Sequence, residues 1–461
     1  MKAPGTAEVL WRHRTFRLYL AGQTSSVAGS SISQVAIPLL AVLHLDAGAG
    51  EVALLAFTGQ LPPALLALHA GALADRRSKR TQMMLSDLVS AAALACVPVA
   101  AATGTLTLPL LMTVAAVQGA AQVVHDAAAI SYLPELVDRS LLQRGNARIG
   151  AVFAVAGAAG NHLGAALSAA VGPARALTGD VVSYLVSIWC TARIRSPRPA
   201  PRAPAGAGVT AEIRDGLHYV RQDHTLLTLT LVNATVAVGL GVLVTLWPLY
   251  ALRHLAMSGA VFGIILGAGA LGAATGALLA PRLAERFGPG PMMLTALALT
   301  PLAHLPLLCA GPGAGWQTVL GIAQFVQLAC AGAAGVTQRT IRQLAAEPAM
   351  QARMQAVSTW LCAVARPLAA LAAGALGTWA GIRPALAAGA ILLAVPFLVL
   401  ARSPLRGLRR MPGAPDPTDT PSPSGGDPMT DPLPAHRVRT AIPPPGPRGA
   451  AESGTGPERT P

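Results

Sequence analysis

The chain has 461 residues, of which 53% are hydrophobic and 12% are charged, and its formal net charge is +14. Soluble globular proteins carry about 25% charged residues, so this composition excludes an ordinary water-soluble fold and predicts a chain dissolved mainly in lipid. The basic residues lie between apolar runs and do not gather in one polar domain, which argues against nucleic-acid binding. The five cysteines stand singly, so the sequence predicts no disulfide framework, no structural zinc and no cofactor.

Twelve apolar runs follow one another along the chain, and each is long enough to cross a membrane, which takes about 20 residues. The first run follows a polar, basic N-terminal segment and lacks a small-residue cleavage site. It is therefore predicted to remain as a membrane helix and not to be removed as a signal peptide. The predicted helices span residues 17–43, 52–74, 82–102, 107–130, 149–171, 176–193, 225–251, 259–281, 291–310, 316–338, 355–379 and 384–401.

Positive charge alternates between the loops that join these runs. Lys and Arg gather on the N-terminal segment, on every second loop and after the last run; the loop after the tenth run, for example, holds Arg339, Arg342 and Arg353. The opposite loops hold only Arg175, Arg253 and Arg383. Because positive loops stay on the cytoplasmic side, the pattern predicts an all-α membrane protein with an even number of helices and both termini in the cytoplasm.

A Pro-rich and then amphipathic segment divides the runs into two sets of six. The predicted organisation is an N-terminal six-helix bundle, a cytoplasmic central loop, a C-terminal six-helix bundle and a disordered cytoplasmic tail, at residues 1–193, 194–224, 225–402 and 403–461. A weak repeat relates the halves, because a Gly-x-Leu followed by charges begins at Gly71 after the second helix and at Gly276 after the eighth. Such repeated halves are typical of transporters whose halves rock about a central site.

The segment Gly71 to Arg80, GALADRRSKR, resembles the G-x-x-x-D-R-x-G-R-R signature of the major facilitator superfamily, with Ser78 in place of the second glycine. The resemblance implies the major facilitator fold, in which twelve transmembrane helices form two pseudo-symmetric six-helix bundles. In that family the motif latches the two halves on the cytoplasmic side. An ordinary positively charged cytoplasmic loop is the simpler alternative. The residues implied in this cytoplasmic gate are Gly71, Asp75, Arg76, Lys79 and Arg80.

Further segments resemble the branch of the superfamily that contains macrolide-efflux and enterobactin-exporter-like proteins. They are Gly22–Ser30, Ser86–Leu88, His125–Val137, Asp180–Tyr184 and Glu212–Val220. The segment Gly160 to Ala165 resembles the antiporter motif G-P-x-x-G-G of helix five, although Asn161 replaces its proline and Ala165 its last glycine. The resemblance implies export, with Gly160 and Gly164 allowing close helix packing.

Charged and polar side chains inside the predicted membrane helices are the candidate site residues, since charge in a bilayer is costly and usually faces a cavity or a partner. The candidates for proton coupling are Asp126, Asp180 and Asp87, although positions near helix ends also fit solvated or capping roles. The candidates for a substrate cavity are His162, Asn161, Asn233 and Arg366. His162 alternatively bonds a neighbouring helix, and Arg366 either pairs with a carboxylate or orients an anionic substrate.

The sequence therefore predicts a monomeric secondary transporter in the bacterial inner or plasma membrane. The leading hypothesis is proton-coupled export of an amphipathic small molecule, such as a drug, antibiotic or siderophore, by alternating access. An uptake carrier or facilitator, and a signalling protein that kept the fold but lost transport, are the alternatives. No clustered His, Asp or Glu with ligand or nucleophile spacing lies in the predicted helices, so an enzyme is not expected.

Overall fold

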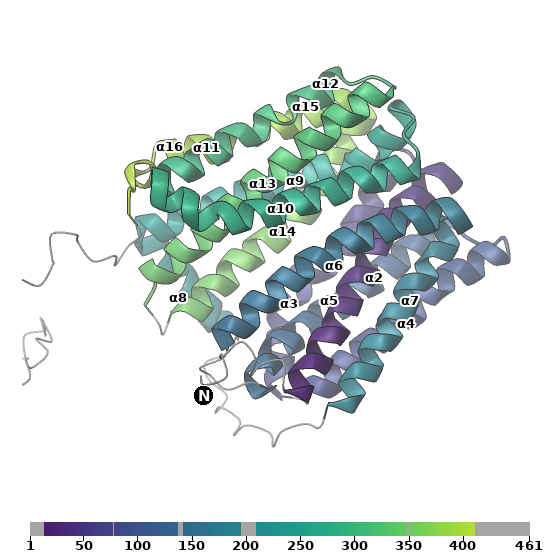
Figure 1. The fold of residues 1–461 in the computed structure, drawn as a ribbon, viewed down its shortest axis with the longest axis horizontal. Coiled ribbons are helices and arrows are strands. Elements are labelled where there is room, and N and C mark those ends of the chain that lie inside the picture. The colour runs from purple at the N-terminus through teal and green to yellow at the C-terminus, as the bar shows by residue number, and fades with distance from the viewer. Residues whose placement is uncertain (1–12, 77, 137–141, 195–208, 348–349, 411–461) are drawn as a thin grey trace, which may run out of the picture. The chain divides into compact units, whose positions relative to one another are not determined.

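The protein is helical throughout the part that the computed structural model describes, residues 13–76, 78–136, 142–194, 209–347 and 350–410 (Figure 1). Within these ranges the side chains of residues 68–69, 71–76, 134, 142–148, 151, 154, 209–213 and 352–353 are not described. The chain divides by its contacts into two units, Met1–Ala414 and Pro415–Pro461. All described residues belong to the first unit.

Every predicted apolar run contains a helix. The N-terminal set is α2 (Arg14–Leu39), which continues as the π-helix η1 (Leu40–His44), then α3 (Ala49–Arg76), α4 (Lys79–Ala102), α5 (Leu108–Leu136), α6 (Leu142–Val171) and α7 (Pro173–Arg193). The C-terminal set is α9 (His224–Leu249), which continues as the π-helix η3 (Tyr250–His254), then α10 (Gly259–Phe287), α11 (Pro289–Leu302), α12 (Leu305–Cys309), α13 (Ala314–Ala345), α14 (Gln351–Trp379), α15 (Ile382–Leu392) and α16 (Ala394–Ala401).

Among the described residues, nine helical stretches are long and apolar enough to cross a membrane. They correspond to α2 with η1, α4, α5, α9 with η3, α10, α11 with α12, α13, α14, and α15 with α16. The helices α3, α6 and α7 occupy the other three predicted runs. The multi-span helical architecture is thus confirmed, and the count of twelve spans stays a prediction.

Helices of each set pack mainly on one another. In the N-terminal set α2 lies against α6 and α7, and α5 lies against α3 and α4; in the C-terminal set α9 lies against α14 and α15, and α10 against α13. The most extensive contacts between the sets are those of α3 with α14 and of α6 with α10. Glycine allows the closest approaches: a Cβ on Gly276 would lie 1.9 Å from the carbonyl oxygen of Ala329.

The structure corrects two details of the predicted boundaries and defines the amphipathic part of the predicted central loop. The amphipathic helix α8 (Val209–Gln222) forms within the predicted central loop and packs on α14. The predicted disordered tail is wrong for residues 403–410, because Leu405 in the 3-10 turn η4 (Pro404–Gly407) is buried and the Gly290 N–H donates to the Leu408 carbonyl at 2.9 Å. Residues 411–461 lie outside the described part. Arg342, predicted on a loop, is buried near the end of α13 because that helix continues to Ala345.

Candidate functional site

A buried polar network joins α2, α4 and α5. His125 on α5 is 3% exposed and Asp87 on α4 is 2% exposed, and His125 Nδ1 lies 2.8 Å from Asp87 Oδ1. Gln23 Nε2 on α2 donates to His125 Nε2 at 2.9 Å. Because the amide nitrogen can only donate, Nε2 accepts and the ring proton sits on Nδ1, facing the carboxylate.

The negative charge of Asp87 is incompletely compensated. The contact between His125 Nδ1 and Asp87 Oδ1 is too poorly aligned with the ring N–H to be a hydrogen bond, so its attraction is electrostatic. Asp87 Oδ2 is buried and has no hydrogen-bond partner. A buried carboxylate is costly unless it is paired and hydrogen-bonded. Both side chains of the Asp87–His125 pair are titratable, and binding one proton changes the charge of the pair by one unit.

Asp126 lies beside this pair but has a different environment. It is exposed on α5, and Gln122 Nε2 donates to its Oδ1 at 2.8 Å. Asp126 follows Gly119 by two helical turns on the same face of α5, and a Cβ on Gly119 would lie 2.2 Å from the Gly59 carbonyl oxygen of α3. The carboxylate therefore lies on the α5 face that packs toward α3.

Asp180 sits at the contact of α2 with α7 and is fully buried. The Ser33 hydroxyl donates to its Oδ2, and the Ser183 hydroxyl lies 3.0 Å from its Oδ1. A Cβ on Gly29 would lie 2.5 Å from Oδ1 and 1.9 Å from the Ser183 hydroxyl oxygen. The segments Gly22–Ser30 and Asp180–Tyr184 thus pack together, and both carboxylate oxygens have hydroxyl partners. This environment fits a structural role better than a proton-carrying one.

The residues singled out on α6 lie at two helix contacts. A Cβ on Gly160 would lie 2.3 Å from the Ala28 carbonyl oxygen of α2, and one on Gly164 would lie 2.8 Å from Ile32 Cα. Asn161 is buried, and its Oδ1 has no hydrogen-bond partner. The His162 imidazole lies against α10, since its Nε2 would be 2.3 Å from a Cβ on Gly267. His162 therefore lies where the N- and C-terminal helices meet.

A second polar cluster lies among the C-terminal helices. Asn233 Nδ2 on α9 donates to Cys362 Sγ at 3.0 Å and to Ser358 Oγ at 3.4 Å, both on α14. Arg342 on α13 is 5% exposed, donates through Nη1 to Ser358 Oγ and leaves its Nε without a partner. Arg366 is exposed on α14, and no ion pair to a described carboxylate is found for it. The alternative in which Arg366 pairs with a carboxylate is therefore not observed.

The described basic residues of the predicted cytoplasmic gate bond within the N-terminal set. Lys79 Nζ on α4 lies 2.6 Å from Glu135 Oε1 on α5. Arg80 donates to the carbonyls of Thr191 and Ala192 near the end of α7, at 3.0 and 2.5 Å. The backbone of Gly71 to Arg76 ends α3, but the side chains of Asp75 and Arg76 lie outside the described part. The proposed latch between the halves thus stays a prediction.

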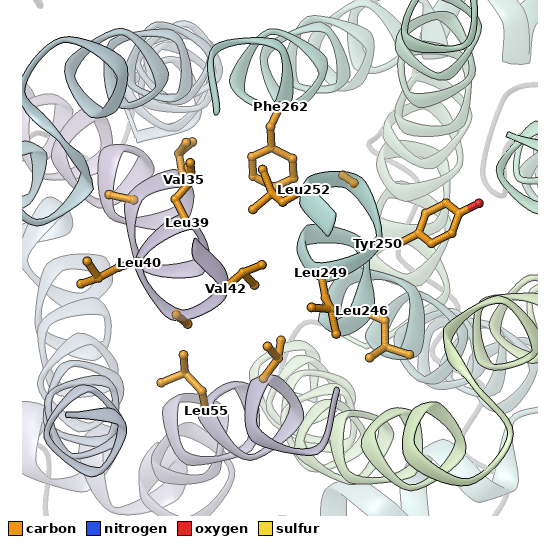
Figure 2. Close-up of a cluster of buried hydrophobic side chains, with 14 of the residues drawn as sticks. Val35, Leu39, Leu40, Val42, Leu55, Leu246, Leu249, Tyr250, Leu252 and Phe262 are labelled. Carbon is orange, nitrogen blue, oxygen red and sulfur yellow. The ribbon is translucent and has the colours of Figure 1, made fainter. Parts of the chain in front are cut away.

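The two sets close against each other where η1 meets η3. Arg253 on η3 forms an ion pair with Asp46 and donates to the Val42 carbonyl of η1 at 3.0 Å. Figure 2 shows Val42 and Leu249 facing each other inside an apolar cluster. The labelled members of this cluster are Val35, Leu39, Leu40, Val42, Leu55, Leu246, Leu249, Tyr250, Leu252 and Phe262. We call this contact the η1/η3 closure.

Sequence reasoning singled out the aspartates but missed their partners. His125 stands next to Asp126 in a recognised segment, and this adjacency was the available signal. Gln23 and Arg342 carried no comparable signal, because only the packing of separate helices makes Gln23 a partner of His125 and buries Arg342. No group of three or more His, Cys, Asp or Glu able to hold a metal ion occurs in the described part of the chain.

Comparison with known proteins places this geometry in a family. A multidrug efflux pump Tap of Mycobacterium tuberculosis is 30% identical over 421 residues, which covers 86% of this chain and 95% of the relative. The Tap pump of Mycolicibacterium fortuitum is 27% identical over 403 residues, covering 83% and 93%. The fold is similar to the crystal structure of a bacterial homologue of the iron transporter ferroportin in an inward-facing state, with a TM-score of 0.68 and 14% identity, covering 84% of this chain and 99% of that one.

The family model for transmembrane secretion effectors matches residues 7–420, nearly the whole helical part. Together with the helical, multi-span fold, this match makes the protein a transporter of the bacterial cell membrane and not an enzyme. The chain belongs to the transmembrane secretion effector family, an efflux-like branch of the major facilitator superfamily.

Proposed function

We propose that the protein is a proton-coupled exporter that moves amphipathic small molecules out of the cell by alternating access. Similarity to pumps named for multidrug efflux supports the direction of transport. The observation that carries the proton coupling is the buried Asp87–His125 pair, whose carboxylate has one oxygen without a partner. A proton is the smallest ligand that relieves such a charge in an apolar surrounding.

Helix α2 connects this pair with the η1/η3 closure. It carries Gln23, which bonds His125, and it continues into η1, which contacts η3. A proton bound at His125 Nε2 breaks the hydrogen bond from Gln23, and this change acts on α2, the helix whose far end forms the η1/η3 closure. In the proposed cycle, the η1/η3 closure is the outer gate of a state that is open toward the cytoplasm. When this outer gate opens, protons entering from outside load the Asp87–His125 pair as substrate leaves.

The test uses the full chain in inside-out vesicles with an imposed proton gradient and labelled amphiphiles of three classes: a macrolide, a tetracycline and a neutral steroid. We expect gradient-dependent accumulation of at least one. Asp87→Asn and His125→Gln should each reduce this accumulation at least tenfold, because each removes one of the two titratable groups of the pair. Glu347→Gln, which changes an exposed carboxylate, is the matched control and should leave it unchanged.

Three outcomes contradict the proposal. Accumulation that is driven equally without a gradient removes the proton coupling. Gradient-driven loss of amphiphile from the same vesicles reverses the direction and identifies an uptake carrier. Absence of movement for all three classes removes export of amphiphiles altogether.

A further inference from the structure

A cavity of about 230 Å³ lies among the C-terminal helices, away from the Asp87–His125 pair. Its walls come from α9, α10, α13 and the junction of α11 with α12, and α2 adds Gln34 and Pro38. Most of the wall is aliphatic or aromatic, and the rings of Trp247 and Phe262 form one side with their centroids 6.3 Å apart.

Two hydrogen-bond donors in this wall are unused. Gln327 is 2% exposed, and its Nε2 has no partner. Trp247 Nε1, whose N–H can only donate, also has none. More than about nine in ten buried polar groups in proteins are hydrogen-bonded. Both donor atoms are themselves buried, so each side chain must turn toward the cavity to meet a ligand there. Two unpaired donors on lining residues of one cavity indicate a ligand that brings hydrogen-bond acceptors.

The charge of the wall restricts this ligand further. None of the described lining residues is acidic, so a cation entering the cavity would lose its hydration without gaining a counter-charge. The titratable side chain in the wall is His304, whose Nδ1 donates to the Thr300 carbonyl at 2.8 Å. The apolar surface and the Trp247–Phe262 side favour a flat ring system.

We infer that this cavity binds neutral, flat and mainly apolar molecules through a carbonyl or ether oxygen that accepts hydrogen bonds from Trp247 and Gln327. The inference rests on the proposed function, for which it names the substrate class. It also separates the two ligands in space: the proton binds among the N-terminal helices and the amphiphile among the C-terminal ones. The proton and the amphiphile are then coupled through a conformational change of the protein, and they do not compete directly for one carboxylate.

Two rigid aromatic molecules of nearly equal size test this assignment, since fluorenone carries a carbonyl group and fluorene does not. Binding of each to the full chain in nanodiscs is measured by equilibrium dialysis, with empty nanodiscs subtracted. Wild-type protein should bind fluorenone more tightly than fluorene. Trp247→Phe and Gln327→Met should each weaken fluorenone binding about three- to tenfold, the effect of one hydrogen bond, and leave fluorene binding unchanged. Retained fluorene binding also shows that each variant keeps its cavity.

Matched controls and a second readout localise the effect. The control Trp189→Phe changes an exposed tryptophan of α7, and the control Gln338→Met changes a buried glutamine on the same helix as Gln327. Neither residue lines the cavity, so neither substitution should alter fluorenone binding. Benzophenone, itself a neutral diaryl ketone, should photolabel peptides of α9 and α13, and excess fluorenone should suppress this labelling more strongly than excess fluorene.

Equal affinity of wild-type protein for the two molecules overturns the inference. So does fluorenone binding that both cavity variants leave unchanged, and so does labelling confined to α4 and α5. The proposed function fails separately: if no amphiphile is transported while the carbonyl preference depends on Trp247 or Gln327, the binding site stands and the exporter does not. If gradient-driven export depends on Asp87 but no carbonyl preference exists, the exporter stands and this site does not.

Discussion

At the scale of single residues, Asp87 and Asp180 are two buried carboxylates with different neighbours. Asp180 accepts hydrogen bonds from the hydroxyls of Ser33 and Ser183, whereas Asp87 leaves one oxygen without a partner. We expect Asp180→Ala to lower the free energy of unfolding by about 2 kcal/mol, because it strands the buried Ser33 hydroxyl. The Ser183 hydroxyl keeps its hydrogen bond to the backbone carbonyl of residue 180. Unfolding in detergent, followed by circular dichroism, measures the change.

Asp180→Asn keeps an acceptor oxygen and should leave gradient-driven accumulation close to that of the wild type. Asp87→Asn, the same substitution at the carboxylate that has an unpaired oxygen, should abolish gradient-driven accumulation. Loss of coupling in Asp180→Asn with unchanged stability in Asp180→Ala would reverse the two roles.

The sequence was sufficient to find these aspartates because charge is rare inside apolar runs. It did not distinguish them, since the distinction lies in partners that other helices supply. His125 and Gln23 reach Asp87 only through the packing of α2, α4 and α5. Arg342 was assigned to a loop because the hydrophobic run ends before the helix does, and α13 continues with one polar but buried face.

At the scale of helices, the close contact between α6 and α2 depends on glycines, and Gly160 makes the tightest approach. A Cβ on Gly160 would lie 2.3 Å from the Ala28 carbonyl oxygen and 2.7 Å from Ser31 Cβ. We expect Gly160→Ala to force the two helices apart and to lower the unfolding free energy by about 1–3 kcal/mol, the usual cost of overpacking. Thermal unfolding of the detergent-solubilised protein measures this difference.

Gly157→Ala is the control on the same helix, three residues earlier. Its added Cβ would meet Ser31 Oγ at 3.7 Å, an ordinary contact, and alanine is the better helix former. Stability should therefore stay equal or increase. Equal destabilisation by the two substitutions would mean that α6 and α2 do not approach as closely as the structure places them.

Helix positions could be predicted from hydropathy, whereas the π-helical ends could not. A repeat of eight residues, P-L-x-A-x-x-H-L, begins at Pro38 and again at Pro248, and both copies end in a π-helix. Their hydrogen bonds match: the Leu45 N–H donates to the Leu40 carbonyl at 3.1 Å, and the Leu255 N–H donates to the Tyr250 carbonyl at 3.0 Å. The repeat at Pro38 and Pro248 is therefore stronger than the one near Gly71 and Gly276.

At the scale of the whole molecule, three interactions hold the η1/η3 closure: the ion pair of Arg253 with Asp46, the hydrogen bond from Arg253 to the Val42 carbonyl, and the apolar cluster. Their magnitudes differ. Asp46 is 95% exposed, so its ion pair with Arg253 contributes only about 0–1 kcal/mol. The apolar cluster is buried. Leu39, for example, is 4% exposed, and its side chain packs against α10, where it would lie 2.5 Å from a Cβ added at Gly259. Truncating such a leucine costs about 2 kcal/mol or more. The apolar cluster, and not the ion pair, should therefore determine how often the η1/η3 closure opens.

Labelling of Leu249→Cys with a membrane-impermeant maleimide measures that opening, since Leu249 is 1% exposed in the closed state. In this background Leu39→Ala should raise the labelling rate about thirtyfold, the factor that corresponds to 2 kcal/mol. Arg253→Gln should raise it about fivefold at most. Leu65→Ala, which truncates an exposed leucine of α3, should leave it unchanged, and the chain with its native cysteines alone supplies the background. A larger rise for Arg253→Gln than for Leu39→Ala would make the ion pair the dominant lock, and the closure would then weaken with salt as exposed charge pairs do.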